Sequence, residues 1–132
     1  MRVLALDLGV TTGWACVDDK ANVCGIGQFQ HQEGEVYANL VSMYHPHHVV
    51  AETPVIIRGT LGEKLTRVIS TVRSIIPGAV EIDPAQWKNS WWGDADVPRA
   101  TTQHEKDALR MAYWYLETRL KTANVRTNVY GS

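Results

Sequence analysis

Four side chains of the types that bind metal ions stand at informative places in the sequence. Asp7 and Glu52 each close a short apolar stretch, and His104 and Asp107 are three residues apart, which puts them on one side of a helix. Carboxylates that converge repel one another unless cations bridge them, and hard oxygen ligands with an imidazole suit Mg²⁺ or Mn²⁺. These four residues therefore form a candidate metal site.

The chemistry of such a site is phosphoryl transfer. Two divalent ions about 4 Å apart stabilise the attacking and leaving oxygens of an in-line displacement, so the expected substrate is a phosphodiester. A bound ion also lowers the pKa of water, and His104 is suited either to ligate the metal or to accept the proton. Each of the four residues alone is also explained as a turn residue or an exposed helix position. Asp107, however, shares the helical stripe that should face the sheet, where an unpaired acid is costly.

The hydrophobic pattern predicts the elements that position these residues. Capping-box patterns at Thr60-x-x-Glu63 and Thr102-x-x-Glu105 predict two helix starts. The predicted strands are Arg2 to Leu8, Trp14 to Val17, Val23 to Phe29, His48 to Glu52 and Ala79 to Ile82. The predicted helices are Gly34 to Tyr44, Thr60 to the Pro77-Gly78 stop, a short helix or turn over Pro84 to Trp92, and Gln103 to Leu120.

This order of elements predicts the fold class. Three antiparallel strands followed by strands entered through helices make an α/β fold with a mixed five-stranded sheet flanked by helices, which is the ribonuclease-H-like arrangement. In it the first and fourth strands are parallel neighbours, so Asp7 and Glu52 fall at one edge of the sheet and the helix that carries His104 can lower its first turn onto them. We expect one nuclease domain over residues 1–132.

Composition narrows the class of protein. The chain has 132 residues, 45% hydrophobic and 20% charged, without repeats or low-complexity tracts, which excludes a disordered chain or a fibre. The apolar runs are far shorter than the ~18 residues of a membrane span or a signal-peptide core, so we expect no membrane contact and a cytoplasmic location, in the host cytoplasm if the protein is viral.

The charge is distributed unevenly. The formal net charge is −1, but residues 1–52 hold two basic and six acidic residues, whereas residues 53–132 hold eleven basic and eight acidic ones. The second half is therefore suited to a polyanion. Lys64 and Arg67 share the polar side of a helix, consistent with phosphate tracking, and Arg58, in a loop just past Glu52, is the best candidate for a DNA contact. For each of them the alternative is a solvated surface residue.

Three further groups favour structural interpretations. We expect the tryptophans to pack rather than to stack on bases, and the histidine-rich stretch to be a surface loop. We expect the two cysteines to be reduced, packed thiols, because they have no metal or redox spacing. The residues concerned are Trp87, Trp91 and Trp92, the segment His45-Pro46-His47-His48, and Cys16 with Cys24.

Several motifs in order resemble the RuvC-type Holliday junction resolvases, most closely their short phage members. They are Leu4-Ala5-Leu6-Asp7-Leu8-Gly9-x-x-Thr12-Gly13-Trp14, Val49-Val50-Ala51-Glu52, Pro84-x-x-Trp87-Lys88 and His104-x-x-Asp107-Ala108-Leu109. The resemblance implies a ribonuclease-H-like homodimer with two Mg²⁺ or Mn²⁺ ions that makes paired symmetric nicks in four-way DNA junctions. It also implies that Asp7, Glu52, His104 and Asp107 are catalytic and that Lys88 contacts phosphate.

The chain departs from this family at two positions. Val55 stands where several members place an aromatic wedge, and His104 stands where many have aspartate. A broader branched-DNA or flap nuclease and a non-cutting junction-binding protein of the same fold therefore stay open as alternatives. The segment Asp7 to Gly13 also resembles the phosphate loop of actin-like and sugar-kinase-like ATP-binding proteins, but that group needs two such domains, and 132 residues supply one.

Overall fold

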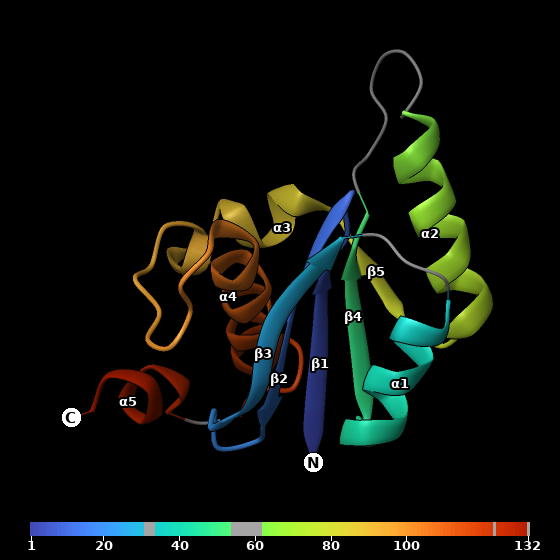
Figure 1. The fold of residues 1–132 in the computed structure, drawn as a ribbon. Coiled ribbons are helices and arrows are strands. Elements are labelled where there is room, and N and C mark those ends of the chain that lie inside the picture. Colours follow the sequence, from blue (N-terminus) through green and yellow to red (C-terminus); the bar gives the residue numbers. More distant parts are fainter. Residues whose placement is uncertain (31–33, 54–61, 123, 132) are drawn as a thin grey trace.

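A mixed five-stranded sheet forms the centre of the protein (Figure 1). The computed structural model describes residues 1–30, 34–53, 62–122 and 124–131. Strand β1 pairs antiparallel with β2, which pairs antiparallel with β3, and β4 runs parallel to both β1 and β5, giving the order β3-β2-β1-β4-β5. The strands are β1 (Arg2–Asp7), β2 (Thr11–Asp18), β3 (Val23–Gln30), β4 (His48–Glu52) and β5 (Val80–Ile82). The predicted fold class is confirmed.

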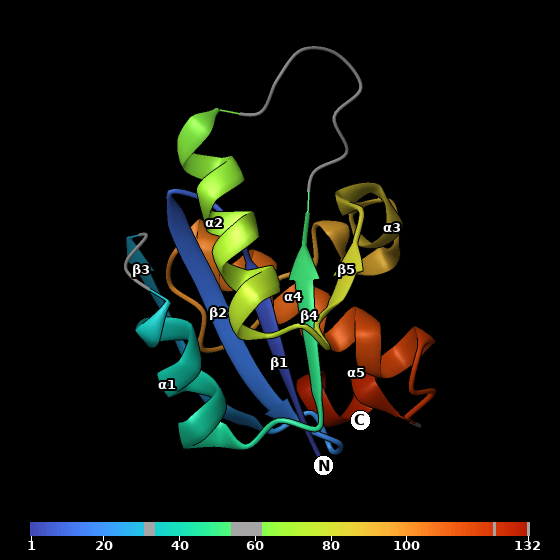
Figure 2. The ribbon, with the colours of Figure 1, turned by 90° about the vertical axis from the view of Figure 1, so that its right-hand side faces the viewer.

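Helices cover both faces of the sheet (Figures 1 and 2). One face carries α1 (Glu35–Tyr44) and α2 (Glu63–Ile75). The other carries α4 (Gln103–Thr118), together with α3 (Pro84–Lys88), the 3₁₀ helix η1 (Trp91–Gly93) and α5 (Val125–Tyr130). No helix in the described part of the chain is long and apolar enough to cross a membrane.

Side chains of the central strands point alternately to the two faces of the sheet and contribute to a hydrophobic core on each face. In β1, Val3 and Ala5 pack into the core beneath α4, whereas Leu4 and Leu6 pack into the core beneath α1 and α2. All four are fully buried, which explains why β1 reads as a continuous apolar run rather than an alternating one. By the same alternation, Asp7 follows Ala5 on the α4 face.

Helix α4 begins as its sequence predicts. Thr102 is the N-cap, and its hydroxyl accepts a hydrogen bond from the Glu105 amide at 3.2 Å. The Glu105 carboxylate accepts in return from the Thr102 amide at 3.1 Å, which completes the capping box. The apolar side of the helix then packs on β1 and β2, with Ala108, Leu109 and Met111 fully buried. The cap therefore fixes the start of α4, whose first two turns carry His104 and Asp107.

Helix α2 begins later than predicted. Its N-cap is Gly62, which has no side chain to cap the helix, so Glu63 is the first helical residue rather than the third. Thr60, the predicted cap, lies outside the described residues. Helix α5 was not predicted, because its six residues bury only Val125 and show no clear period.

Most of the structural interpretations hold in the described chain. Trp87 and Trp92 are fully buried, but Trp91 is 47% exposed. The cysteines are free, as expected, and Cys16 is buried, but Cys24 is exposed on the edge strand β3, so the prediction that it packs is wrong.

Candidate active site

The two acids predicted to meet at a sheet edge do so. Asp7 ends β1 and Glu52 ends β4, and the parallel pairing places these two residues directly opposite each other. Both lie on the α4 side of the sheet and both are buried, Asp7 to 9% exposure and Glu52 to 5%. Two carboxyl groups that are this close together and shielded from solvent cannot both be ionised without a large energetic cost.

The close approach of α4 brings a third side chain to these acids. Gly13, opposite Asp7 in the β1 and β2 pairing, lies directly under the backbone of His104, so a Cβ at this position would collide with the His104 carbonyl group. Because Gly13 has no side chain, the first turn of α4 settles on β2. The His104 Nδ1 atom then lies 3.3 Å from Asp7 Oδ2.

The surroundings of Asp7 hold a proton on this pair of acids. Desolvation by burial, a hydrogen bond with Glu52 and the negative charges of Glu52 and Asp107 raise the pKa of Asp7 from 3.8 to about 9, which the Lys88 ammonium opposes only in part. Without bound cations, the Asp7 and Glu52 pair therefore keeps a proton at neutral pH.

Asp107 is held by its own helix. Its Oδ1 atom accepts from Gln103 Nε2 at 2.9 Å and lies 3.3 Å from Arg110 Nη1. Arg110 is itself anchored, since its Nε donates to the Ala95 carbonyl at 2.7 Å. Asp107 is thus near enough to act on Asp7 through its charge, while its carboxylate is turned to Gln103 and Arg110.

Lys88 supplies a cation next to Glu52. The Lys88 Nζ atom lies 3.5 Å from Glu52 Oε1. It makes no hydrogen bond to that oxygen, which is buried and has no hydrogen-bond partner among the described residues. A buried carboxylate oxygen without a donor is an open ligand position, and the donor set of carboxylates and one imidazole suits a hard divalent cation.

The four predicted site residues converge only in part. The structure brings Asp7 into contact with Glu52 and with His104, whereas Asp107 acts on Asp7 only through its charge. Within residues 1–30, 34–53, 62–122 and 124–131, no three acidic, histidine or cysteine side chains are arranged to hold a metal ion together. The residue types suit a divalent cation, but their placement is not yet that of a metal site, because the Asp107 carboxylate contacts Gln103 and Arg110 instead.

The predicted DNA-contacting residues flank the same edge. Lys64 and Arg67, on the first turns of α2, line a groove of about 230 Å³ with Val10 and Gln30, which belong to the turn after β1 and the end of β3. Arg67 also pairs with Glu63 at 3.0 Å, but both side chains are largely exposed. Arg58 and Val55 lie outside the described residues.

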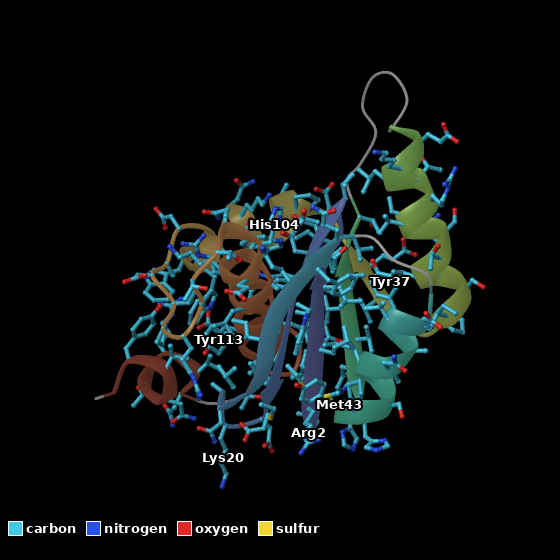
Figure 3. The ribbon with its side chains drawn as sticks, in the orientation of Figure 1. Arg2, Lys20, Tyr37, Met43, His104 and Tyr113 are labelled. Carbon is cyan, nitrogen blue, oxygen red and sulfur yellow. The ribbon has the colours of Figure 1, made fainter. Side chains whose placement is uncertain are left out.

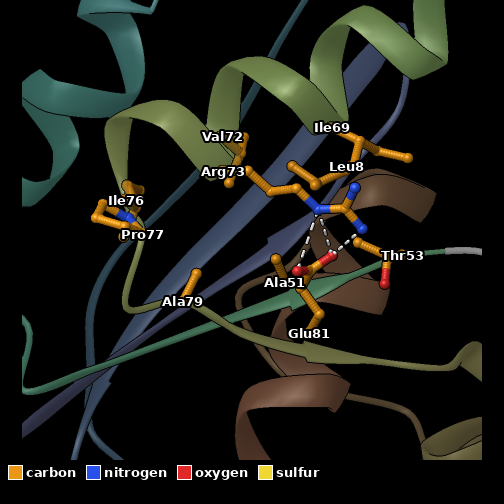
Figure 4. Close-up of a pocket in the computed structure, with 10 residues that line it drawn as sticks. All are labelled: Leu8, Ala51, Thr53, Ile69, Val72, Arg73, Ile76, Pro77, Ala79 and Glu81. Atoms are coloured by element: carbon orange, nitrogen blue, oxygen red, sulfur yellow. Dashed lines mark hydrogen bonds and ion pairs between the residues drawn. The ribbon is translucent and has the colours of Figure 1, made fainter.

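A second cavity, of about 100 Å³, lies between α2 and the strands β4 and β5 (Figure 4). It is lined mainly by apolar side chains, and Arg73 and Glu81 form an ion pair at 2.7 Å beside it. Ala51 and Thr53, the neighbours of Glu52, line this cavity, whereas Glu52 itself belongs to the α4 side. It is therefore separate from the acidic site.

Sequence reasoning overlooked Arg110 and Gln103. Their only sequence signal is spacing, because they stand three residues after and four residues before Asp107 on the predicted helix. That signal is common to most charged pairs on helices, and the contact of Arg110 with Ala95 depends on how a distant loop packs.

Comparison with known proteins identifies structures of the same fold. The chain resembles the Thermus thermophilus RuvC structure, with a TM-score of 0.69 and 19% identity over 92% of this chain and 98% of that one. The RuvC structure from the same organism in complex with Holliday junction substrate gives the same score and identity, over 92% and 97%. A fowlpox virus resolvase in complex with Holliday junction DNA gives 0.58 and 13%, over 91% and 99%.

These similarities span whole chains rather than a shared fragment. No family model and no curated protein matches the sequence. The resemblance to RuvC-type resolvases that the motifs indicated is thus found again in three dimensions, and the chain has the ribonuclease-H-like fold that RuvC and the fowlpox virus resolvase share.

Proposed function

We propose that this protein is a metal-dependent, structure-selective DNA endonuclease that resolves four-way (Holliday) junctions by paired symmetric nicks. The observation that carries the proposal is the contact of Asp7 with Glu52 and His104 at one sheet edge. It is supported by the shared fold, because a RuvC structure with Holliday junction substrate is similar over 92% of this chain.

The cofactor we propose is a pair of Mg²⁺ or Mn²⁺ ions held by Asp7, Glu52, His104 and Asp107. When bound, such ions stabilise the attacking and leaving oxygens of phosphodiester hydrolysis and lower the pKa of the attacking water. The unpartnered Glu52 Oε1 atom and the acidic donor set support this assignment.

The protein's own groups prepare the site. Asp7 and Glu52 offer buried carboxylates whose directions are fixed by paired strands, so little reorganisation is needed there. Asp7 and Glu52 would hold the cation as carboxylates, so the proton that the raised pKa of Asp7 keeps on this pair would have to be lost on binding. His104, whose side chain is 45% exposed, is accessible to substrate and water, and is suited to ligate or to accept the proton.

Basic residues hold the substrate. Val10, in the turn that follows Asp7, lines the same groove as Lys64 and Arg67, which supports a path for the DNA backbone from the acids along α2. Lys88 stands beside Glu52 and is placed to contact the phosphate that is cut. Such phosphate contacts position the nucleic acid without reading its sequence.

Paired nicks require two active sites. The described chain contains one acidic cluster of this kind, so symmetric cuts on two strands of a junction need two copies. We therefore propose a homodimer in which each copy cuts one strand, as the symmetry of a four-way junction favours.

Cleavage of a labelled four-way junction, a flap and a plain duplex, with Mg²⁺, Mn²⁺ or EDTA, tests the proposal. We expect paired nicks that are confined to the junction and disappear in EDTA. Cutting of the flap or duplex at equal rates would point instead to a broader branched-DNA nuclease, and binding to the junction without any cutting to a non-enzymatic protein.

A further inference from the structure

Lys88 is held firmly by its short helix. The N-cap of α3, Asp83, forms a capping box with Gln86, and Trp87, the residue before Lys88, is fully buried in the core. The Lys88 ammonium lies 5.4 Å from the centre of the Trp87 ring and 3.5 Å from Glu52 Oε1. The backbone of Lys88 is thus fixed while its side chain, 47% exposed, keeps access to solvent.

The ammonium faces the one oxygen of the Glu52 carboxylate that has no hydrogen-bond partner among the described residues. Among the described residues, Lys88 forms an ion pair with Glu52, and no hydrogen bond reaches Glu52 Oε1. Arg110, another cation near the site, is engaged by Asp107 and by the Ala95 carbonyl. His104 faces Asp7 rather than Glu52.

We infer that Lys88 is the counter-ion of Glu52 in the metal-free protein, and that its ammonium must leave Glu52 Oε1 before a divalent cation can bind there. This inference rests on the proposed metal site. Like charges that compete for one carboxylate oxygen disfavour each other, so Lys88 lowers the affinity of the site for metal and stabilises the protein in its absence. The released ammonium is then free to bind a phosphate of the substrate.

Three variants separate this role from a phosphate contact alone. Lys88→Met removes the charge and keeps an apolar side chain, Lys88→Arg keeps the charge, and Lys20→Met is a matched control in the turn between β2 and β3, at the opposite end of the sheet from His104 (Figure 3). The measurements are the thermal midpoint in EDTA and the affinity for Mn²⁺ alone by titration calorimetry, both at pH 8 and without DNA.

We expect Lys88→Met to lower the thermal midpoint in EDTA by a few degrees, on the order of 2–5 °C, and to bind Mn²⁺ roughly tenfold more tightly than the wild type. Lys88→Arg and Lys20→Met should resemble the wild type in both measurements. A Lys88→Met protein as stable as Lys20→Met in EDTA, or one whose Mn²⁺ affinity is unchanged or weaker, overturns the inference. Failure of the wild type itself to bind Mn²⁺ overturns the proposed metal site, and the EDTA comparison still tests the counter-ion role.

Discussion

At the scale of single residues, Asp7 has the most strongly perturbed environment of the proposed site residues. Burial, a hydrogen bond with Glu52 and the charge of Asp107 all favour its protonated form, and together they raise its pKa to about 9. A carboxyl group in this state is destabilised whenever it is ionised without a cation beside it. An ionised Asp7 would therefore destabilise the fold at high pH.

Asp7→Asn should abolish cleavage while leaving junction binding largely intact. The amide keeps the size of the carboxylate but is a poor ligand for a hard cation, so we expect cleavage to fall by about a thousandfold or more. Cleavage rates and the dissociation constant for a four-way junction measure the two effects. Undiminished cutting by this variant would remove Asp7 from the mechanism.

The pKa of Asp7 also predicts how stability depends on pH in EDTA. Because this pKa is 3.8 in an ordinary carboxyl and about 9 in the folded protein, the folded state holds a proton that the unfolded state releases between these values. The free energy of unfolding should therefore fall as the pH rises from about 4 to about 9. Urea titrations of Asp7→Asn should show a weaker decline and greater stability than the wild type at pH 8; equal slopes in the two proteins would contradict the raised pKa.

At this scale the sequence predicted which residue types gather, but not how they pair. Asp7 and Glu52 were predictable because strand ends are visible in the hydrophobic pattern. The contacts of Lys88 with Glu52 and of Arg110 with Asp107 and Ala95 were not, because they depend on rotamers set by the packing of α3, α4 and the loop between them.

At the scale of elements, the site depends on how closely α4 approaches β2. Gly13 allows this approach, and the Thr102 cap fixes where the helix begins. The start of α4 was predictable, since its capping box is formed by neighbouring residues. The close contact between Gly13 and His104 was not, because it joins positions far apart in the sequence.

Gly13→Ala should disable the site without unfolding the protein. The added methyl group must push the His104 backbone away from β2, and displacements of about 1 Å at a catalytic group can cost about 100-fold in rate. Gly78→Ala is the matched control, because nothing lies within 4 Å of a Cβ at that position. Circular dichroism checks the fold and junction cleavage checks the activity; equal activity of the two variants would show that the packing of α4 on Gly13 does not position His104.

At the scale of the whole molecule, charge is distributed unevenly despite a net charge of −1, and the proposed DNA binding depends on this distribution. Asp7 and Glu52 are buried at one sheet edge, whereas Lys64 and Arg67 are exposed and line a groove with Val10 and Gln30. The fold class followed from the order of elements along the sequence. The groove could not be predicted from the sequence, because it is formed by α2, the turn after β1 and the end of β3, which are far apart along the chain.

Replacing Lys64 and Arg67 together with methionine should weaken binding to junction DNA most strongly at low salt. The slope of log affinity against log salt concentration is negative, and its magnitude falls by about 0.9 for each lost phosphate contact. We therefore expect the magnitude of the slope to fall by about 2. Fluorescence anisotropy in EDTA over a series of NaCl concentrations measures the slope, with Lys20→Met as the control. An unchanged slope would place the DNA elsewhere on the surface.

The most direct measurement of junction resolution uses a supercoiled plasmid that extrudes a cruciform. Two nicks made on opposite strands within one binding event linearise the plasmid, whereas independent single nicks leave an open circle. We expect the wild type with Mg²⁺ or Mn²⁺ to produce linear plasmid directly, and Asp7→Asn or EDTA to leave it supercoiled. Open circles as the lasting product, or linear plasmid formed equally well by Asp7→Asn, would contradict paired cutting by the site at Asp7, Glu52, His104 and Asp107.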